Sequence, residues 1–298
     1  MSPSQIKISQ SLRNLLNWVG SGLAIAGILF IGYRLHSYWL ELDLSKITPL
    51  GWGLIFFLAI VYGAANFLLA YAWWQLLQHF CRYGNIANSV KIYGMSQLAK
   101  YVPGNIFHLA GRQALGMSAG IPTKSLAQSM IWELILIAVT GSFFFWLILP
   151  RLLHHFPLTL GIILMLTSFI LAVCLLHRYL GHHIAVAITY QMFFLLISAS
   201  IFIVLIGLIS GYDKLTPSYW VIIGGTYTIA WLAGLVTPGS PAGVGVREMI
   251  LLIILKGIIA EDSLLVVVLL GRIITVIGDV LFFLVTTCIP SKIYAIER

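Results

Sequence analysis

The feature of this sequence that most constrains its fold is a series of apolar runs that recur along the chain. An α-helix rises about 1.5 Å per residue, so roughly 20 apolar residues cross the ~30 Å hydrocarbon core of a bilayer. Runs of this length predict an all-α integral membrane protein with about seven spanning helices. The predicted helices cover residues 15–35, 49–77, 126–149, 158–176, 184–209, 217–236 and 264–289.

The low charge content of the chain excludes the soluble classes of protein. Asp, Glu, Lys and Arg make up 9% of the 298 residues, whereas a soluble domain carries about 25% to cover its surface. The 17 basic residues are dispersed, so no nucleic-acid partner is expected. Their distribution among the connections predicts a cytoplasmic N-terminus. No connection is long enough to fold separately, so residues 1–298 are expected to form a single polytopic membrane domain.

Two segments, residues 90–121 and 236–257, mix apolar residues with clustered Pro and Gly, and their apolar runs are too short to span. Irregular backbone in lipid would leave N–H and C=O groups without hydrogen bonds, so such segments must be shielded by protein or line a wet cavity. We therefore expect two broken or re-entrant helices, with Asn105 and Ser240 as N-caps of the half-helices that follow the breaks. The motif residues of the breaks are Pro103, Gly104, Pro238, Gly239, Gly243 and Gly245.

The two broken segments belong to an internal repeat. Pro103 and Pro238 each stand nine residues before an arginine, Arg112 or Arg247. A Gly-Ile pair and then a Ser-Leu pair follow in both copies, and a Thr-Pro pair opens the helix that precedes each. Paired interrupted segments in corresponding halves indicate the binding site of a transporter. The two predicted halves are residues 48–149 and 216–290.

Six ionisable side chains fall inside the predicted membrane segments. Each would cost about 2.5–3.5 kcal/mol at a lipid-facing helix centre, so they must pair with one another, face a cavity, or both. Two interpretations stay open: buried ion pairs that lock the helices together, and a polar site whose arginines receive an anionic headgroup. The six residues are Arg112, Glu133, Arg247, Glu248, Arg272 and Asp279.

The functional interpretation predicts a central site for the phosphate of a membrane lipid, because arginine beside the N-terminus of a half-helix suits phosphate. His108 lies four residues before Arg112 and would share its helix face, with simple packing as the alternative. The sequence offers no metal-ligand spacing, no nucleotide loop and no catalytic constellation, so no metal, cofactor or catalytic residue is expected. The predicted phosphate-binding residues are Arg112, Arg247, Arg272, Lys100, Asn105 and His108, and Glu133, Glu248 and Asp279 are the predicted charge partners or headgroup contacts.

The motifs of the two breaks resemble those of a known family. Residues 100–105 read Lys-Tyr-Val-Pro-Gly-Asn and are followed by Gly111-Arg112, which is similar to a K-Y-x-P-G motif with its downstream G-R. Residues 238–248 are similar to a Gly-rich G-x-G-x-R-E motif. Over nearly its whole length the chain resembles the lysylphosphatidylglycerol synthase transmembrane region family, also called the flippase-like domain. Glu133 and the final helix with Arg272 and Asp279 fit the same pattern.

This resemblance implies a stand-alone member without the soluble domain that synthesises the lipid in the full-length synthases. The implied function is a lipid translocase of the cytoplasmic (inner) membrane that moves a polyprenyl-phosphate-linked sugar or an aminoacyl-phospholipid. The sequence has no ATP site, so movement would be passive or coupled to an ion gradient. The alternatives are an integral membrane transferase acting on a lipid headgroup, and a non-catalytic scaffold that binds envelope-assembly enzymes. The sequence leaves the oligomeric state open.

Overall fold

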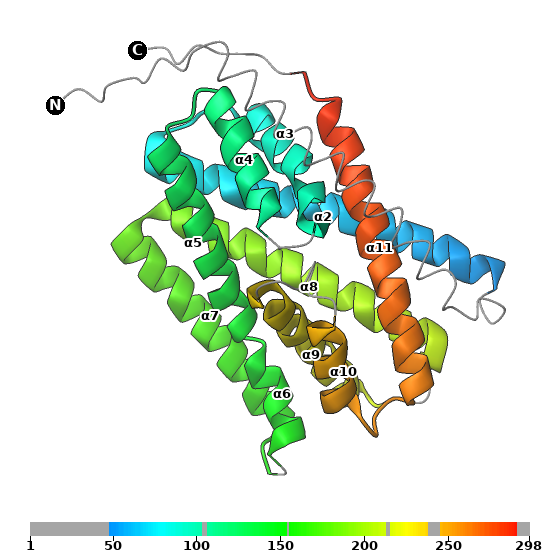
Figure 1. The fold of residues 1–298 in the computed structure, drawn as a ribbon. Helices are drawn as coiled ribbons and strands as arrows, with labels where there is room; N and C mark the ends of the chain where they lie inside the picture. Colours follow the sequence, from blue (N-terminus) through cyan, green and yellow to red (C-terminus); the bar gives the residue numbers. More distant parts are fainter. Residues whose placement is uncertain (1–47, 103–105, 154, 213–214, 238–244, 291–298) are drawn as a thin grey trace.

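The computed structural model describes residues 48–102, 106–153, 155–212, 215–237 and 245–290 (Figure 1). Within these residues the fold is all-α, and the only β feature is an isolated bridge between Lys256 and Ile259. In chain order the elements are α2 (Pro49–Cys81), α3 (Ile86–Gln97), the 3-10 turn η2 (Leu98–Tyr101), α4 (Phe107–Ser118), α5 (Thr123–Ser142), α6 (Phe145–Leu152), α7 (Leu158–Leu180), α8 (His182–Ser210), α9 (Pro217–Val236), α10 (Val246–Leu255) and α11 (Glu261–Thr287).

Six segments in the described part of the chain are long and apolar enough to cross a membrane. They are α2, α5 together with α6, α7, α8, α9 and α11, and each coincides with a predicted range. The prediction of an all-α, multi-pass membrane protein is therefore confirmed. The remaining predicted helix, residues 15–35, lies outside the described residues.

Helix α2 is the central packing element, and it contacts α8, α11, α5 and α3. It begins where the sequence places a start signal: the Thr48 hydroxyl accepts a hydrogen bond from the Gly51 N–H at 3.2 Å, and Pro49 follows at the first helical position. Proline suits that position because its missing N–H would have no partner there. The helix ends at Arg82, which adopts a left-handed conformation with φ 53°.

Helices α2 and α11 cross at a pair of glycines, Gly63 and Gly278. A Cβ atom added at Gly278 would lie 2.7 Å from the carbonyl oxygen of Ala59, and one added at Gly63 would lie 2.9 Å from the carbonyl oxygen of Gly278. Small residues let membrane helices approach this closely. Next to the crossing, the Asn66 side-chain amide donates to Oδ1 of Asp279 at 3.1 Å. The crossing therefore sets the position of the buried Asp279 carboxylate against α2.

The first predicted break is confirmed as a discontinuous segment. Residues 90–121 are divided among α3, η2 and α4, and α3 and α4 have 12 residues each. Twelve residues reach only about 18 Å along a helix axis, which is too short to cross a bilayer. In the second segment α10 has 10 residues, and residues 238–244 lie outside the described part of the chain. Both half-helices are followed by a glycine with positive φ, Gly120 at 85° and Gly257 at 79°, which are the glycines of the repeated Gly-Ile pair.

The predicted N-caps of the two half-helices are wrong. Helix α4 starts at Phe107 with Ile106 as its cap, and α10 starts at Val246 with Gly245 as its cap. At α10 the hydrogen-bond acceptor comes from inside the helix, because Oε2 of Glu248 accepts from the Gly245 N–H at 2.6 Å. Gly245 has a φ of 91°, a conformation that glycine adopts without strain and that an Asn, Ser or other L-residue adopts rarely.

Candidate functional site

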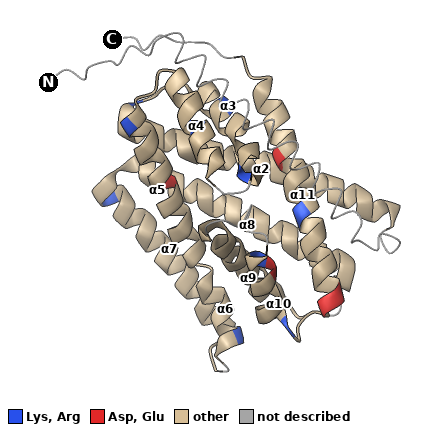
Figure 2. Cartoon of the chain, viewed as in Figure 1, with Lys and Arg blue, Asp and Glu red and all other residues tan. Residues whose placement is uncertain are grey.

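The intramembrane charges fall into two separate clusters. Figure 2 shows how few charged residues the helices carry. We call the first cluster the α4–α5 clasp; it consists of Arg112 and Glu133. The second surrounds a pocket and contains the remaining four predicted residues together with Lys100. Five of the six predicted residues are at most 7% exposed, and the Glu248 side chain is 24% exposed. The second-cluster residues are Lys100, Arg247, Glu248, Arg272 and Asp279.

The α4–α5 clasp is a closed ion pair. The Arg112 guanidinium binds Oε2 of Glu133, and the other carboxylate oxygen accepts from the Tyr93 hydroxyl at 2.8 Å. The guanidinium also lies over the Tyr93 ring, with its carbon 3.8 Å from the ring centroid. Arg112 is 1% exposed, so neither water nor lipid reaches it. Because both charges are neutralised within the protein, the clasp fits the locking interpretation of these two residues.

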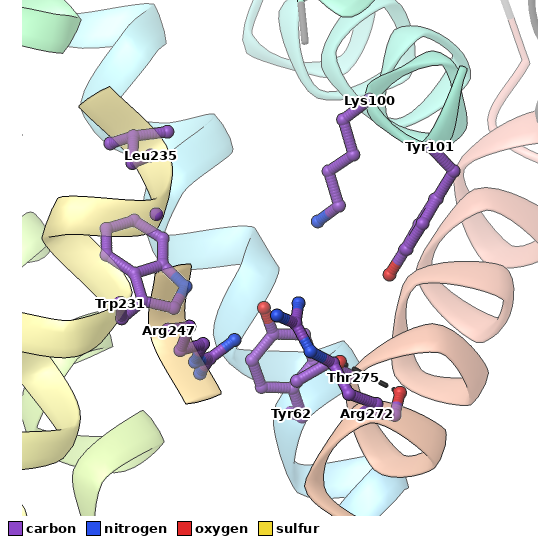
Figure 3. Close-up of a pocket in the computed structure, with 9 residues that line it drawn as sticks. Tyr62, Lys100, Tyr101, Trp231, Leu235, Arg247, Arg272 and Thr275 are labelled. Carbon is purple, nitrogen blue, oxygen red and sulfur yellow. Dashed lines mark hydrogen bonds between the residues drawn. The ribbon is translucent and has the colours of Figure 1, made fainter. Parts of the chain in front are cut away.

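The second cluster encloses a pocket to which five elements contribute (Figure 3). Its volume of about 70 Å³ is room for several water molecules. Element η2 ends two residues before Pro103, and the end of α9 and the start of α10 flank residues 238–244. Residues that flank both Pro-Gly breaks therefore line one pocket. Its polar and charged lining residues are Tyr62, Lys100, Tyr101, Arg247, Arg272 and Thr275, with Trp231 on the α9 side.

Lys100 reaches from η2 into the pocket and pairs with Asp279 on α11. The Lys100 Nζ is 2.7 Å from Oδ2 of Asp279, and the Tyr101 hydroxyl donates to the same oxygen. The other carboxylate oxygen accepts from Asn66. Asp279 is completely buried, whereas the Lys100 side chain is 19% exposed. The carboxylate therefore has hydrogen bonds on both oxygens, and the lysine is the member of the pair that faces the pocket.

Arg272 of α11 pairs with Glu248 of α10. Its Nε and Nη2 atoms lie 3.0 Å and 2.8 Å from Oε1 of Glu248. Since Oε2 of Glu248 accepts from the Gly245 N–H, this one carboxylate connects α11 to the first turn of α10. The pair therefore holds the half-helix after the second break against the last spanning helix.

The surroundings of Arg247 differ from those of the other two pocket cations, Lys100 and Arg272. It is 7% exposed, and its guanidinium carbon lies 4.5 Å from the centroid of the Tyr227 ring. Over the described ranges of the chain, Arg247 makes no ion pair with any carboxylate. A cation over an aromatic face gains about 0.5–2 kcal/mol, less than a buried charge loses by leaving water. Counting the described side chains, the pocket has two neutral ion pairs and one uncompensated positive charge.

The structure separates the predicted phosphate-binding residues. Lys100, Arg247 and Arg272 line the pocket, whereas Arg112 belongs to the clasp. His108 lies on α4 and does not line the pocket, and its buried Nδ1 has no hydrogen-bond partner among the described residues. The predicted charge partners are each in an ion pair: Glu133 with Arg112, Glu248 with Arg272, and Asp279 with Lys100. Asn105 and the motif residues Pro103, Gly104, Pro238, Gly239 and Gly243 lie outside the described residues.

Several aromatic and amide side chains of the site were not predicted. Tyr93 and Tyr227 look like apolar core residues in the sequence, and nothing there indicates that they lie beneath arginines. Asn66 carries a detectable signal, since it is an amide inside the apolar run of α2. Tyr101 directly follows Lys100 in the first motif and could have been included on that ground.

The lining of the pocket is rich in cationic side chains and is therefore suited to bind an anionic group. Within the described residues no group of three His, Cys, Asp or Glu side chains is arranged to hold a metal ion. The guanidinium and ammonium groups present hydrogen-bond donors, and phosphate oxygens accept hydrogen bonds from such groups.

Comparisons of the chain with protein-family models, with curated proteins and with solved structures found no match.

Proposed function

We propose that the protein is a lipid translocase and that its pocket binds the phosphate of a lipid headgroup. The observation that carries this proposal is Arg247, a buried cation that lines the pocket without a carboxylate partner in the described part of the chain. Keeping such a charge in the membrane is costly, and intramembrane ionisable groups mark substrate pathways by default. A phosphate at this position would neutralise the charge and accept two parallel hydrogen bonds from the guanidinium.

The surroundings of the pocket support passage of a headgroup. Lys100 and Arg272 add further cationic groups to the lining of the pocket, and the Tyr62 hydroxyl adds an uncharged donor. Lining residues of the pocket adjoin both Pro-Gly motifs in the sequence, and interrupted helices of this kind border the substrate site in other transport proteins. In this proposal the polar headgroup crosses through the pocket while its apolar tails stay in the lipid.

The two motifs that resemble those of the lysylphosphatidylglycerol synthase transmembrane region also support the proposal. In this proposal the protein lies in the cytoplasmic membrane, as the resemblance implies, and its N-terminus is cytoplasmic, as the distribution of Lys and Arg predicts. The substrate that the resemblance implies is a phosphate-bearing lipid, such as a polyprenyl-phosphate-linked sugar or an aminoacyl-phospholipid. Since no nucleotide-binding motif is present in the sequence, movement in this proposal is passive or driven by an ion gradient.

A vesicle assay tests the proposal. The purified full chain is reconstituted into liposomes that contain a fluorescent phosphatidylglycerol, and a membrane-impermeant quencher reports how fast the lipid of the inner leaflet reaches the outer one. We expect wild type to speed this exchange and Arg247→Gln to abolish most of the gain. Arg178→Gln is the matched control, because Arg178 is exposed at the end of α7. Equal rates for wild type and Arg247→Gln would overturn the role of Arg247.

The same preparation distinguishes the alternatives. A headgroup-transfer product formed in detergent, where no leaflets exist, would replace the proposal with a membrane transferase. Unchanged lipid exchange in Arg247→Gln and Lys100→Gln, together with lost binding to envelope-assembly enzymes, would replace it with a scaffold.

A further inference from the structure

The pocket has a charge balance that selects among headgroups. Asp279 neutralises Lys100 and Glu248 neutralises Arg272, each through direct contacts of 2.7–2.8 Å. Arg247 remains, so the described side chains give the site one net positive charge. The free energy of holding net charge in a low-dielectric medium rises steeply with the size of that charge. The most stable complex is therefore one in which the ligand brings a single negative charge.

Other headgroup charges leave the complex unbalanced. A zwitterionic headgroup leaves Arg247 uncompensated in a largely buried site. A phosphomonoester or a diphosphate adds more negative charge than Arg247, the cation left without a carboxylate among the described side chains, can neutralise. To bind the excess, the site would have to break an existing ion pair, and breaking a buried pair is costly.

The two carboxylates beside the pocket do not offer a place for an ammonium group. Both oxygens of Asp279 accept hydrogen bonds from Asn66, Tyr101 and Lys100. Both oxygens of Glu248 are likewise occupied, one by Arg272 and the other by the Gly245 N–H. An aminoacylated headgroup would bring one or more ammonium groups into a pocket that already has an excess of positive charge. The arrangement therefore disfavours aminoacyl-phospholipids.

Resting on the proposed function, we infer that the substrate is a lipid with one phosphodiester and an otherwise uncharged polar headgroup, such as a sugar or a glycerol. Glu248 and Asp279 are the residues that set this charge selectivity, because each removes one positive charge from the pocket. Trp231 on the α9 side of the pocket supplies an aromatic surface of the kind on which the apolar face of a polyol packs. Of the two lipid classes considered above, the inference selects the sugar-phosphate lipid.

The test is a charge series of short-chain lipids titrated by calorimetry into the full chain in a non-ionic detergent. The probes are the dihexanoyl forms of phosphatidylglycerol (one negative charge), phosphatidylcholine (zwitterionic), lysylphosphatidylglycerol (net charge near zero, since its α-amino group is largely deprotonated at the pH used) and phosphatidic acid. All are measured at about pH 8.5, where a phosphomonoester carries close to two negative charges. We expect phosphatidylglycerol to bind at least about tenfold more tightly than the other three, since each of them leaves a net charge in the site.

Glu248→Gln removes the charge and keeps one of the two contacts of the side chain, since the amide oxygen can still accept from the Gly245 N–H while the amide nitrogen cannot accept from Arg272. It raises the net charge of the pocket to about two. The affinity ratio of phosphatidic acid to phosphatidylglycerol should then rise by about tenfold. Glu261→Gln is the matched control, because Glu261 is exposed in the first turn of α11, and its ratio should equal that of wild type. If Glu248→Gln does not fold, Asp279→Asn replaces it in the test. We expect Asp279→Asn to change the affinity ratio in the same direction.

The outcomes separate the inference from the proposed function. If wild type binds lysylphosphatidylglycerol or phosphatidic acid as tightly as phosphatidylglycerol, the inferred selectivity is wrong while the phosphate site stands. An unchanged ratio in a folded Glu248→Gln variant overturns the role of the carboxylates. If none of the four lipids binds, the proposed function falls, and the inference falls with it.

Discussion

The close crossing of α2 and α11 makes a strong prediction for Gly278→Ala. The new Cβ would lie 2.7 Å from the Ala59 carbonyl oxygen and 2.9 Å from the Gly63 nitrogen, whereas ordinary contact begins at 3.4 Å. The helices must therefore separate by about 0.7 Å, because backbone atoms cannot rotate away. The Asn66–Asp279 hydrogen bond, at 3.1 Å, would be stretched out of range. Overpacking costs about 1–3 kcal/mol, and an interhelical hydrogen bond in a membrane protein about 0.6 kcal/mol, so we expect a loss of roughly 2–3 kcal/mol.

Thermal unfolding in detergent, followed by loss of monodisperse protein, measures this loss. Gly271→Ala is the matched control on the same helix, since its Cβ would meet nothing closer than 3.8 Å. The free energy of unfolding of Gly271→Ala should equal that of wild type or exceed it by up to about 1 kcal/mol, because a helix interior accommodates alanine better than glycine. A Gly278→Ala protein as stable as wild type, or equal losses in both variants, would refute the close-crossing argument.

Three further predictions follow from the ion pairs and helix ends. Glu133→Gln leaves Arg112 buried without its carboxylate and should lower the free energy of unfolding by about 3–5 kcal/mol. Chemical denaturation checks this, and a loss below about 1 kcal/mol would contradict the clasp. Replacing both partners, Arg112→Met with Glu133→Leu, should be less destabilising than Glu133→Gln, and a larger loss in the double variant would refute this reasoning. Arg151, exposed on α6, donates to the carbonyl oxygens of residues 254 and 256 at the end of α10, and these hydrogen bonds help to position the helix that carries Arg247. Arg151→Gln should weaken phosphatidylglycerol binding severalfold with little change in melting temperature, and an unchanged dissociation constant would count against this positioning role.

The spanning helices were predictable because their signals are local. Apolar runs of sufficient length identify them, and Pro49 and Pro217 mark two helix starts to the residue. Clustered Pro and Gly likewise locate the breaks, because proline removes a helical hydrogen bond and glycine disfavours a helix interior. The predicted range 126–149 is divided in the structure between α5 and α6 at Phe143 and Phe144. Gly141 and Ser142 stand directly before this break, and such a pair allows a kink, but one pair inside a long apolar run does not distinguish a break from a continuous helix.

The pairing of the charges was not predictable from the sequence. Arg112 and Arg247 occupy equivalent places in the repeat, so the sequence predicts the same role for both. In the described structure only Arg112 of the two makes an ion pair with a carboxylate. The difference depends on how α4 and α10 are rotated against their neighbours, which local patterns do not encode. The same holds for Lys100 and Asp279, which are far apart in the chain and meet because α11 crosses α2 at two glycines.

The most direct test of the account is the affinity of Arg247→Gln for dihexanoyl-phosphatidylglycerol, measured together with its melting temperature. Removing a buried cation that has no carboxylate partner in the described chain should leave the melting temperature equal to or above that of wild type. The same change should weaken binding by at least about tenfold, because charge-assisted hydrogen bonds contribute about 1.5–3 kcal/mol. Arg178→Gln should match wild type in both measurements. A folded Arg247→Gln protein with wild-type affinity would contradict the assignment of the pocket as the headgroup site.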